Sequence, residues 1–259
     1  MAVDASARAV LEAEWAVVRP WIDTIPEAAM DRPSVLEGWT VRDLIAHVST
    51  GIAVISAAEP SEAPAPTVGH ADYVGSYPAV ADRIAEGARR LAAERRDDLG
   101  ALLDSAWAGV MAAADGWGTD ERRLVEVKRG TVRVSELLQT RILEVLVHGD
   151  DLARSVPEIP PPAHDRGALR EMVKLLLGAL VERAPGRSVE VRVPPFAAVQ
   201  VIEGTSHTRG TPPNTVEADP LTWIRVACGR IPWADAEADG TLRVSGTRAP
   251  EVATHLPLL

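Results

Sequence analysis

The chain has 259 residues, 46% of them hydrophobic, which is enough apolar surface for one large core or two smaller ones. Its 27 Lys and Arg against 37 Asp and Glu give a formal net charge of -10, and no segment gathers basic residues beside aromatic ones, so we expect no nucleic-acid partner. No stretch reaches the ~18 uninterrupted apolar residues of a membrane helix, there is no signal-peptide pattern, and a single cysteine excludes an internal disulfide, so we expect a cytoplasmic protein without membrane contact.

Two amphipathic helices are predicted in the first sixty residues. Apolar residues recur at helical spacing from Asp4 to about Trp21, and Pro20 limits the length of this helix. Farther on, Thr40 is a typical N-cap with Asp43 three residues later. The apolar residues that follow predict a helix from Val41 to about Ala58.

The middle of the first half is less regular. Residues Glu59–Gly69 are rich in proline and small residues and predict a flexible loop. Two helical patterns follow, from about Tyr77 to Arg96 and from Asp98 to Ala114. The segment Gly116–Val134 is either irregular chain or a short hairpin around Arg129-Gly130.

A long helix and a proline-rich segment close the first half. Ser135 is a plausible N-cap for a helix from Glu136 to about Ser155. The run Val156–Asp165 then holds four prolines in ten residues, which is typical of a linker. We therefore expect a first domain, a linker and a second domain at residues 1–156, 157–165 and 166–259.

The second domain mixes helical and β patterns. In chain order we expect a helix, three strands, a helix, a strand and a helix, at Arg166–Arg183, Ser188–Val193, Ala197–Ile202, Thr215–Ala218, Pro220–Cys228, Thr241–Ser245 and Pro250–Leu256. Strands and helices mixed in so short a segment predict a small α+β domain.

The helix predicted at Glu136–Ser155 carries a polar stripe on an otherwise apolar surface. Arg141, Glu144, His148 and Asp151 follow one another at steps of three, four and three, which keeps them on one side of the helix. The residues around them are almost all aliphatic, so the stripe should be buried. Buried polar groups have to be hydrogen-bonded, ion-paired or metal-bound.

The stripe contains two potential metal ligands. At four residues apart, the Glu144 carboxylate and the His148 imidazole can share one divalent cation. The third ligand must come from another helix, and His47 is the best candidate because it lies among apolar residues in the middle of a predicted helix. The other histidines lie in predicted loops, near the linker or near the carboxyl end, and they are His70, His164, His207 and His255.

Each of these residues also has a simpler interpretation. Glu144 and His148 could form an ordinary ion pair within one helix, and His47 could be a hydrogen-bonded core histidine. Arg141 could form a buried salt bridge with Glu144. Asp151 could form a salt bridge or a cap, or it could orient His148 by accepting a hydrogen bond from the second ring nitrogen.

Two segments resemble the mycothiol-dependent maleylpyruvate isomerase family: GWTVRDLIAHVS, Gly38–Ser49, and TRILEVLVHGDDLARS, Thr140–Ser155. In that family the amino-terminal half is a DinB-like four-helix bundle, in which a Trp-containing turn leads into a helix bearing a His. A later helix carries Glu-x-x-x-His followed by Asp. The resemblance implies that His47, Glu144 and His148 are zinc ligands.

The resemblance continues beyond the linker. Asn214–Arg230, with VSGTRAPEVATHLPLL after it, is similar to the family's small carboxyl-terminal α+β domain, which is related in shape to sterol-carrier folds. The implied fold class is α+β, with a DinB-like four-helix bundle followed by a small, sterol-carrier-like α+β domain.

The resemblance implies a zinc-dependent enzyme that activates mycothiol or a related small thiol. Three protein ligands leave a coordination position open, where the dication stabilises a thiolate. That thiolate could add to an alkene conjugated to a carbonyl and permit cis-trans isomerisation, or it could be transferred to another electrophile. The expected partners are a small thiol and an electrophilic substrate, and the chain should be a monomer or a homodimer.

Basic residues are needed to bind carboxylates of the substrate or the thiol. Arg225 and Arg230 are the candidates for cofactor binding, and Arg225 and Asp151 for a catalytic role, although both arginines could lie on a solvated helix face. Cys228 has no neighbouring His or acidic residue to activate it, so we interpret it as an inert core residue. The alternatives for the whole chain are a non-catalytic module that binds metal and a small molecule, and a metal-free interaction protein.

Overall fold

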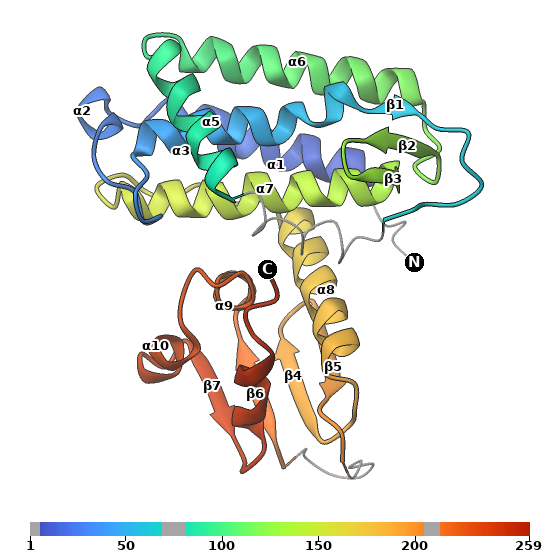
Figure 1. The fold of residues 1–259 in the computed structure, drawn as a ribbon. Helices are drawn as coiled ribbons and strands as arrows, with labels where there is room; N and C mark the ends of the chain where they lie inside the picture. The colour runs from blue at the N-terminus through green and yellow to red at the C-terminus, as the bar shows by residue number, and fades with distance from the viewer. Residues whose placement is uncertain (1–5, 69–80, 205–212) are drawn as a thin grey trace. The chain divides into compact units, whose positions relative to one another are not determined.

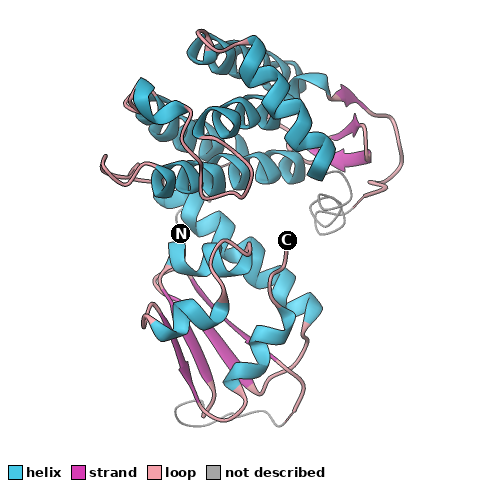
Figure 2. Ribbon diagram, turned by 60° about the vertical axis from the view of Figure 1, so that its left-hand side comes forward, coloured by secondary structure: helices cyan, strands magenta, loops and turns pink. Residues whose placement is uncertain are grey.

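The computed structural model describes residues 6–68, 81–204 and 213–259 and divides into two compact units. Unit 1 is Met1–Ala168 and unit 2 is Leu169–Leu259. Helices dominate unit 1, whereas unit 2 contains a four-stranded sheet and helices (Figure 2), which confirms the predicted fold class. Within the described residues, no helix combines the length and the apolar character needed to cross a bilayer.

The helices of unit 1 form a bundle (Figure 1). Its described α-helices are α1 (Ala7–Ile22), α2 (Glu27–Met30), α3 (Val41–Ala53), α5 (Ala81–Glu94), α6 (Leu99–Trp117) and α7 (Val134–Ser155). Helix α3 is central, because it packs against α5, α6 and α7, while α1 packs along α7. Fully buried aliphatic side chains fill the core of this bundle, among them Val18, Leu44, Ile142 and Leu146.

The start of α3 has the predicted capping box. The Thr40 hydroxyl accepts a hydrogen bond from the backbone N–H of Asp43 at 3.1 Å, and the Asp43 carboxylate accepts one from the backbone N–H of Thr40 at 2.9 Å. The helix ends at Ala53, five residues earlier than predicted, and a 3-10 turn, η1 (Ile55–Ala57), follows. After this turn, Glu59 and Pro60 pair with β2.

Helices α1, α5 and α6 end within a few residues of their predicted ends, whereas the four-residue helix α2 was not predicted. Helix α1 ends at Ile22, one residue beyond the prediction, and α5 ends two residues early. Helix α6 runs to Trp117, where Gly118 ends it with a φ of 72°. The predicted starts at Asp4 and Tyr77 lie outside the described residues.

A small antiparallel sheet lies at one end of the bundle. Its strands are β1 (Glu59–Pro60), β2 (Leu124–Val127) and β3 (Gly130–Arg133), in the order β1-β2-β3. Strands β2 and β3 form the hairpin that was one of the two predictions for this segment. The expectation of a loop at residues 59–69 was wrong for its first two residues, which pair with β2, and Gly69 lies outside the described residues.

The start of α7 differs from the prediction. The helix begins at Val134, directly after β3, so its N-cap is Arg133 and the assignment of Ser135 was wrong. Arg133 has extended backbone angles, and the Glu136 carboxylate accepts a hydrogen bond from its backbone N–H at 3.4 Å. The hairpin leads straight into the helix, which leaves no separate loop for a serine cap.

Unit 2 begins within helix α8 (Arg166–Arg183), whose first three residues belong to unit 1. The other elements are β4 (Val189–Val193), β5 (Ala197–Val201), β6 (Thr215–Ala218), α9 (Pro220–Ala227), α10 (Trp233–Ala238), β7 (Leu242–Ser245) and η3 (Ala249–His255). The sheet order is β5-β4-β6-β7, with β4 and β6 parallel and the other neighbours antiparallel. Strand β4 buries every second side chain, as a sheet with one face on a core requires.

Two short elements of unit 2 differ from the prediction. Helix α10 was not predicted, because six residues are too short to show a helical period. The last element is a 3-10 helix rather than an α-helix, and it begins one residue before Pro250. All four strands and α9 lie within two residues of their predicted positions.

Candidate metal centre

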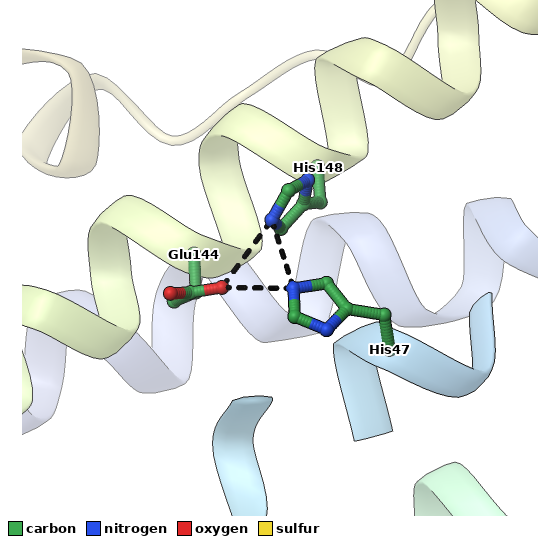
Figure 3. A group of neighbouring side chains, drawn as sticks. All are labelled: His47, Glu144 and His148. Atoms are coloured by element: carbon green, nitrogen blue, oxygen red, sulfur yellow. Dashed lines mark hydrogen bonds and ion pairs between the residues drawn. The ribbon is translucent and has the colours of Figure 1, made fainter. Parts of the chain in front are cut away.

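Helices α3 and α7 bring together three side chains that are far apart in the sequence (Figure 3). His47 comes from the middle of α3, and Glu144 and His148 lie one turn apart on α7. The exposed fractions of the three side chains are 13%, 12% and 10%. The aliphatic residues beside them on both helices are fully buried, so the three polar groups lie in an apolar interface.

One atom of each side chain points toward a common centre. The Nε2 atoms of His47 and His148 are 3.2 Å apart, and Oε2 of Glu144 lies 3.5 Å from the first and 3.3 Å from the second. Ligands of a tetrahedral zinc ion at about 2.0–2.1 Å lie about 3.3 Å from one another. The three separations therefore match the spacing that one small divalent cation imposes.

The chemistry of the donor set also suits a cation. Two imidazoles and one carboxylate are common ligands of catalytic zinc sites, which use three protein ligands. Oε2 of Glu144 is buried, and no described residue makes a geometrically acceptable hydrogen bond to it. A buried carboxylate oxygen without such a bond is costly unless a charge balances it. These residues could hold a metal ion.

The surroundings shift the pKa of each group differently. Burial alone would raise the pKa of Glu144, but the imidazoles of His148 and His47 and the Arg141 guanidinium hold it well below its ordinary value. Burial alone would lower the pKa of His148, but the carboxylates of Asp151 and Glu144 raise it. Burial lowers the pKa of His47, and this outweighs the opposing effect of Glu144. The centre thus contains an ionised carboxylate.

Asp151 contacts the outer nitrogen of His148. Its Oδ2 lies 3.1 Å from Nδ1 of His148, and the Asp151 side chain is fully buried. An imidazole that donates Nδ1–H to a carboxylate presents Nε2 as a lone pair, which is the atom that faces Glu144. The structure thus brings Asp151 to the position that orientation of His148 requires.

His47 has a different neighbour. Its Nδ1 is buried without a hydrogen-bond partner among the described residues, and the Trp39 ring lies edge-on to the imidazole, with centroids 5.4 Å apart at 73°. Packing against an aromatic ring thus orients His47, where a carboxylate orients His148. Trp39 was not among the predicted site residues. Its place in the turn just before the Thr40 cap was the available signal.

The remaining candidate residues lie elsewhere. Arg225 is on α9 and Arg230 lies just after it, both in unit 2 and both partly buried. Cys228 is buried at the end of α9. Nδ1 of His164 lies 2.6 Å from Oε1 of Glu14, whereas His70 and His207 lie outside the described residues. His255 closes η3 in unit 2.

The chain thus combines a helical unit, in which two histidines and one carboxylate could hold a metal ion, with a small α+β unit. The chain belongs to the mycothiol maleylpyruvate isomerase N-terminal domain family, whose model matches residues 11–153. A second model, described as a bacterial SCP ortholog, matches residues 165–258. These matches confirm the resemblance found in the sequence.

Two solved structures are similar to this chain. The crystal structure of the mycothiol-dependent maleylpyruvate isomerase is 20% identical, with a TM-score of 0.59 over 92% of this chain and 91% of that one. The crystal structure of a histidine-to-alanine mutant of the mycothiol-dependent maleylpyruvate isomerase is 19% identical, with a TM-score of 0.57 over 87% and 88%. At these identities the likeness concerns the fold. Comparison with curated protein sequences gives no significant match.

Proposed function

We propose that this chain is a metal-dependent enzyme in which His47, Glu144 and His148 hold a divalent cation, with zinc as the best candidate. Its second cofactor would be mycothiol or a related small thiol. The reaction would be cis-trans isomerisation of a maleylpyruvate-like unsaturated acid, or transfer of the thiol to another electrophile. The observation that carries the proposal is the separation of 3.2 to 3.5 Å among the three ligand atoms.

Zinc bound there would act as a Lewis acid that favours the thiolate form of a thiol at neutral pH. The charges of the ligand residues determine the net charge of the centre that a thiol would approach. Glu144 contributes one negative charge and the two imidazoles contribute none, so the ligand set leaves a divalent centre with a net positive charge. A thiolate is attracted to such a centre.

The protein groups around the centre would hold the ligands in place. Asp151 would keep His148 in one tautomer by accepting its Nδ1–H, and the Trp39 ring would restrict rotation of His47. The buried aliphatic side chains of α3 and α7 exclude water from the helix interface in which the ligands lie. In unit 2, Arg225 and Arg230 remain our candidates for binding carboxylates of the thiol or the substrate, because a guanidinium binds a carboxylate through two parallel hydrogen bonds.

The residue set also bears on the non-catalytic alternative. A purely structural zinc site usually has four protein ligands, often cysteines. The only cysteine of the chain, Cys228, is buried at the end of α9 in unit 2. Three ligands, with no fourth among the described residues, favour a site that accepts a ligand from solution.

The first experiment measures metal content. Purified protein, His148→Ala and His164→Ala are loaded with zinc, dialysed and analysed for metal. His164 is the matched control, because it is also a buried histidine of unit 1 but contacts Glu14 instead of the cluster. We expect about one zinc per chain in the wild type and in His164→Ala, and a loss of at least tenfold in affinity for His148→Ala.

The second experiment measures turnover. The zinc-loaded protein is mixed with maleylpyruvate and mycothiol, and the trans isomer is followed by chromatography. We expect product that depends on both zinc and mycothiol and that disappears in His148→Ala. Equal zinc in wild type and His148→Ala would contradict the metal site, and a zinc-loaded protein that does not bind mycothiol would contradict the thiol-dependent function.

A further inference from the structure

The two oxygens of Glu144 face different partners. Oε2 points toward the two imidazole Nε2 atoms, and the other oxygen points away from them in Figure 3. That second oxygen, Oε1, lies 3.8 Å from Nη2 of Arg141, one turn earlier on α7. The carboxylate therefore lies between a guanidinium on one side and the proposed cation site on the other.

Arg141 is fixed by other contacts. Its side chain is only 2% exposed. Its Nη1 donates to the backbone carbonyl of Gly51 at 2.5 Å, and its Nε donates to the Thr140 hydroxyl at 3.0 Å. The guanidinium thus links α3 to α7, and it cannot move away from Glu144 without giving up these hydrogen bonds.

Gly51 of α3 lies beside the Glu144 carboxylate. A Cβ atom added there would lie 3.4 Å from Oε2 of Glu144, in ordinary contact distance, so the carboxylate packs directly on the surface of α3. The same residue offers its carbonyl to Arg141. The carboxylate is therefore confined on two sides, by the backbone of α3 and by the guanidinium.

We infer that Arg141 is a positioning residue that keeps Glu144 a one-oxygen ligand and so preserves an open coordination position for the thiol. This inference rests on the proposed function, because it requires a metal at the cluster. A carboxylate can bind a metal through one oxygen or both. The positive charge of Arg141 attracts Oε1 away from the centre. Without it, both oxygens of Glu144 can turn toward the cation and occupy the position that an incoming thiol needs.

The test uses the full chain with Co²⁺ in place of zinc, since the visible absorption of Co²⁺ changes with the number and the kind of its ligands. Arg141→Met removes the charge and keeps much of the volume. Arg141→Lys keeps the charge but cannot reach Gly51 and Glu144 together. Arg42→Met is the matched control, because Arg42 is a buried arginine on α3 whose carboxylate partners, Glu27 and Asp31, lie outside the cluster.

We expect the wild type and every variant to bind about one Co²⁺. Arg141→Met should have a visible spectrum that differs from that of the wild type, because a carboxylate oxygen replaces a solvent ligand, and it should bind mycothiol about tenfold more weakly, as measured from the sulfur-to-cobalt absorption band. Arg141→Lys should lie between the two, and it carries the test if Arg141→Met does not fold. Arg42→Met should lose thermal stability but keep the wild-type spectrum and mycothiol affinity.

Three results would overturn the inference. The first is a wild-type spectrum and wild-type mycothiol affinity in both Arg141 variants. The second is loss of Co²⁺ binding from folded Arg141 variants while Arg42→Met retains it, since Arg141 would then serve metal binding as a whole instead of the open position. The third is a wild-type protein that binds no Co²⁺, which would refute the proposed function at the same time.

Discussion

The two units differ in what they bury. Among the described residues, the charged residues and histidines that are buried as whole residues all belong to unit 1, and they are Glu14, Arg42, Arg141, His148, Asp150 and Asp151. The buried polar side chains of unit 2 are neutral, and they are Ser188, Asn214 and Thr222. Burying a charge is unfavourable unless partners compensate it, and an apolar replacement is often as stable. Unit 1 therefore contains groups that stability alone does not require.

A second contrast lies within unit 1. Two buried carboxylates each contact an Nδ1 atom of a histidine, Asp151 with His148 at 3.1 Å and Glu14 with His164 at 2.6 Å. Only the first histidine belongs to the proposed metal centre. Glu14 also accepts a hydrogen bond from the backbone N–H of Asp165 at 2.8 Å, so that pair fastens the linker to α1. A carboxylate that contacts Nδ1 of a histidine thus holds the linker against α1 in one place and a proposed metal ligand in the other.

The largest effect is expected in the apolar core of unit 2. Trp223 on α9 is fully buried, so Trp223→Ala should lower the free energy of unfolding by about 3–5 kcal/mol, from lost burial and the cavity left behind. Urea denaturation followed by circular dichroism measures this loss, and Trp223→Phe should show a smaller one. A change below about 1 kcal/mol in Trp223→Ala would show that unit 2 does not depend on its apolar core.

The next effect separates the two carboxylate and histidine pairs. Asp151→Asn should weaken zinc binding about tenfold, which is about 1.4 kcal/mol, because the amide no longer holds His148 in one tautomer as a carboxylate does. Glu14→Gln should lower the free energy of unfolding by about 2 kcal/mol and leave zinc affinity unchanged. Competition with a chromogenic chelator measures affinity. Equal zinc affinities in the two variants would show that the Asp151–His148 pair and the Glu14–His164 pair do not differ in their effect on zinc binding.

The smallest effect concerns a surface network of unit 1. Arg96 and Arg42 hydrogen-bond to the Asp31 carboxylate and lower its pKa. A carboxyl group with a lower pKa in the folded state stabilises the fold above its unfolded pKa of about 3.9, and this contribution is lost as the pH falls through the folded value. Asp31→Asn should therefore reduce stability slightly at pH 7 and not at low pH. Denaturation at both pH values measures this, and a difference that grows on acidification would contradict it.

Much of the helical architecture follows from periodicity. The apolar pattern of α7 and the capping box at Thr40 predict where these helices lie, and the steps between Arg141, Glu144 and His148 predict one polar stripe. Strand β1 was missed because a two-residue strand containing proline has no pattern of its own, and it exists only through its pairing with β2. The cap of α7 was misplaced because a hairpin leads into the helix directly.

The cluster itself required tertiary information. Nothing in the sequence fixes which face of α3 meets α7, so His47 could be placed only by its apolar neighbours. The edge-on packing of Trp39 and the contact between Gly51 and Glu144 arise from the same helix pairing and have no local signal. The sequence contains the donors, whereas the packing of two helices determines that their atoms converge.

The central claim is that one cation binds both imidazoles and the carboxylate, and X-ray absorption at the zinc edge of zinc-loaded protein tests it most directly. The account predicts nitrogen and oxygen neighbours at about 2.0–2.2 Å, with the outer-shell scattering of two imidazoles that falls to one in His47→Ala. A zinc spectrum without imidazole scattering, or one that is unchanged in His47→Ala, would contradict the claim.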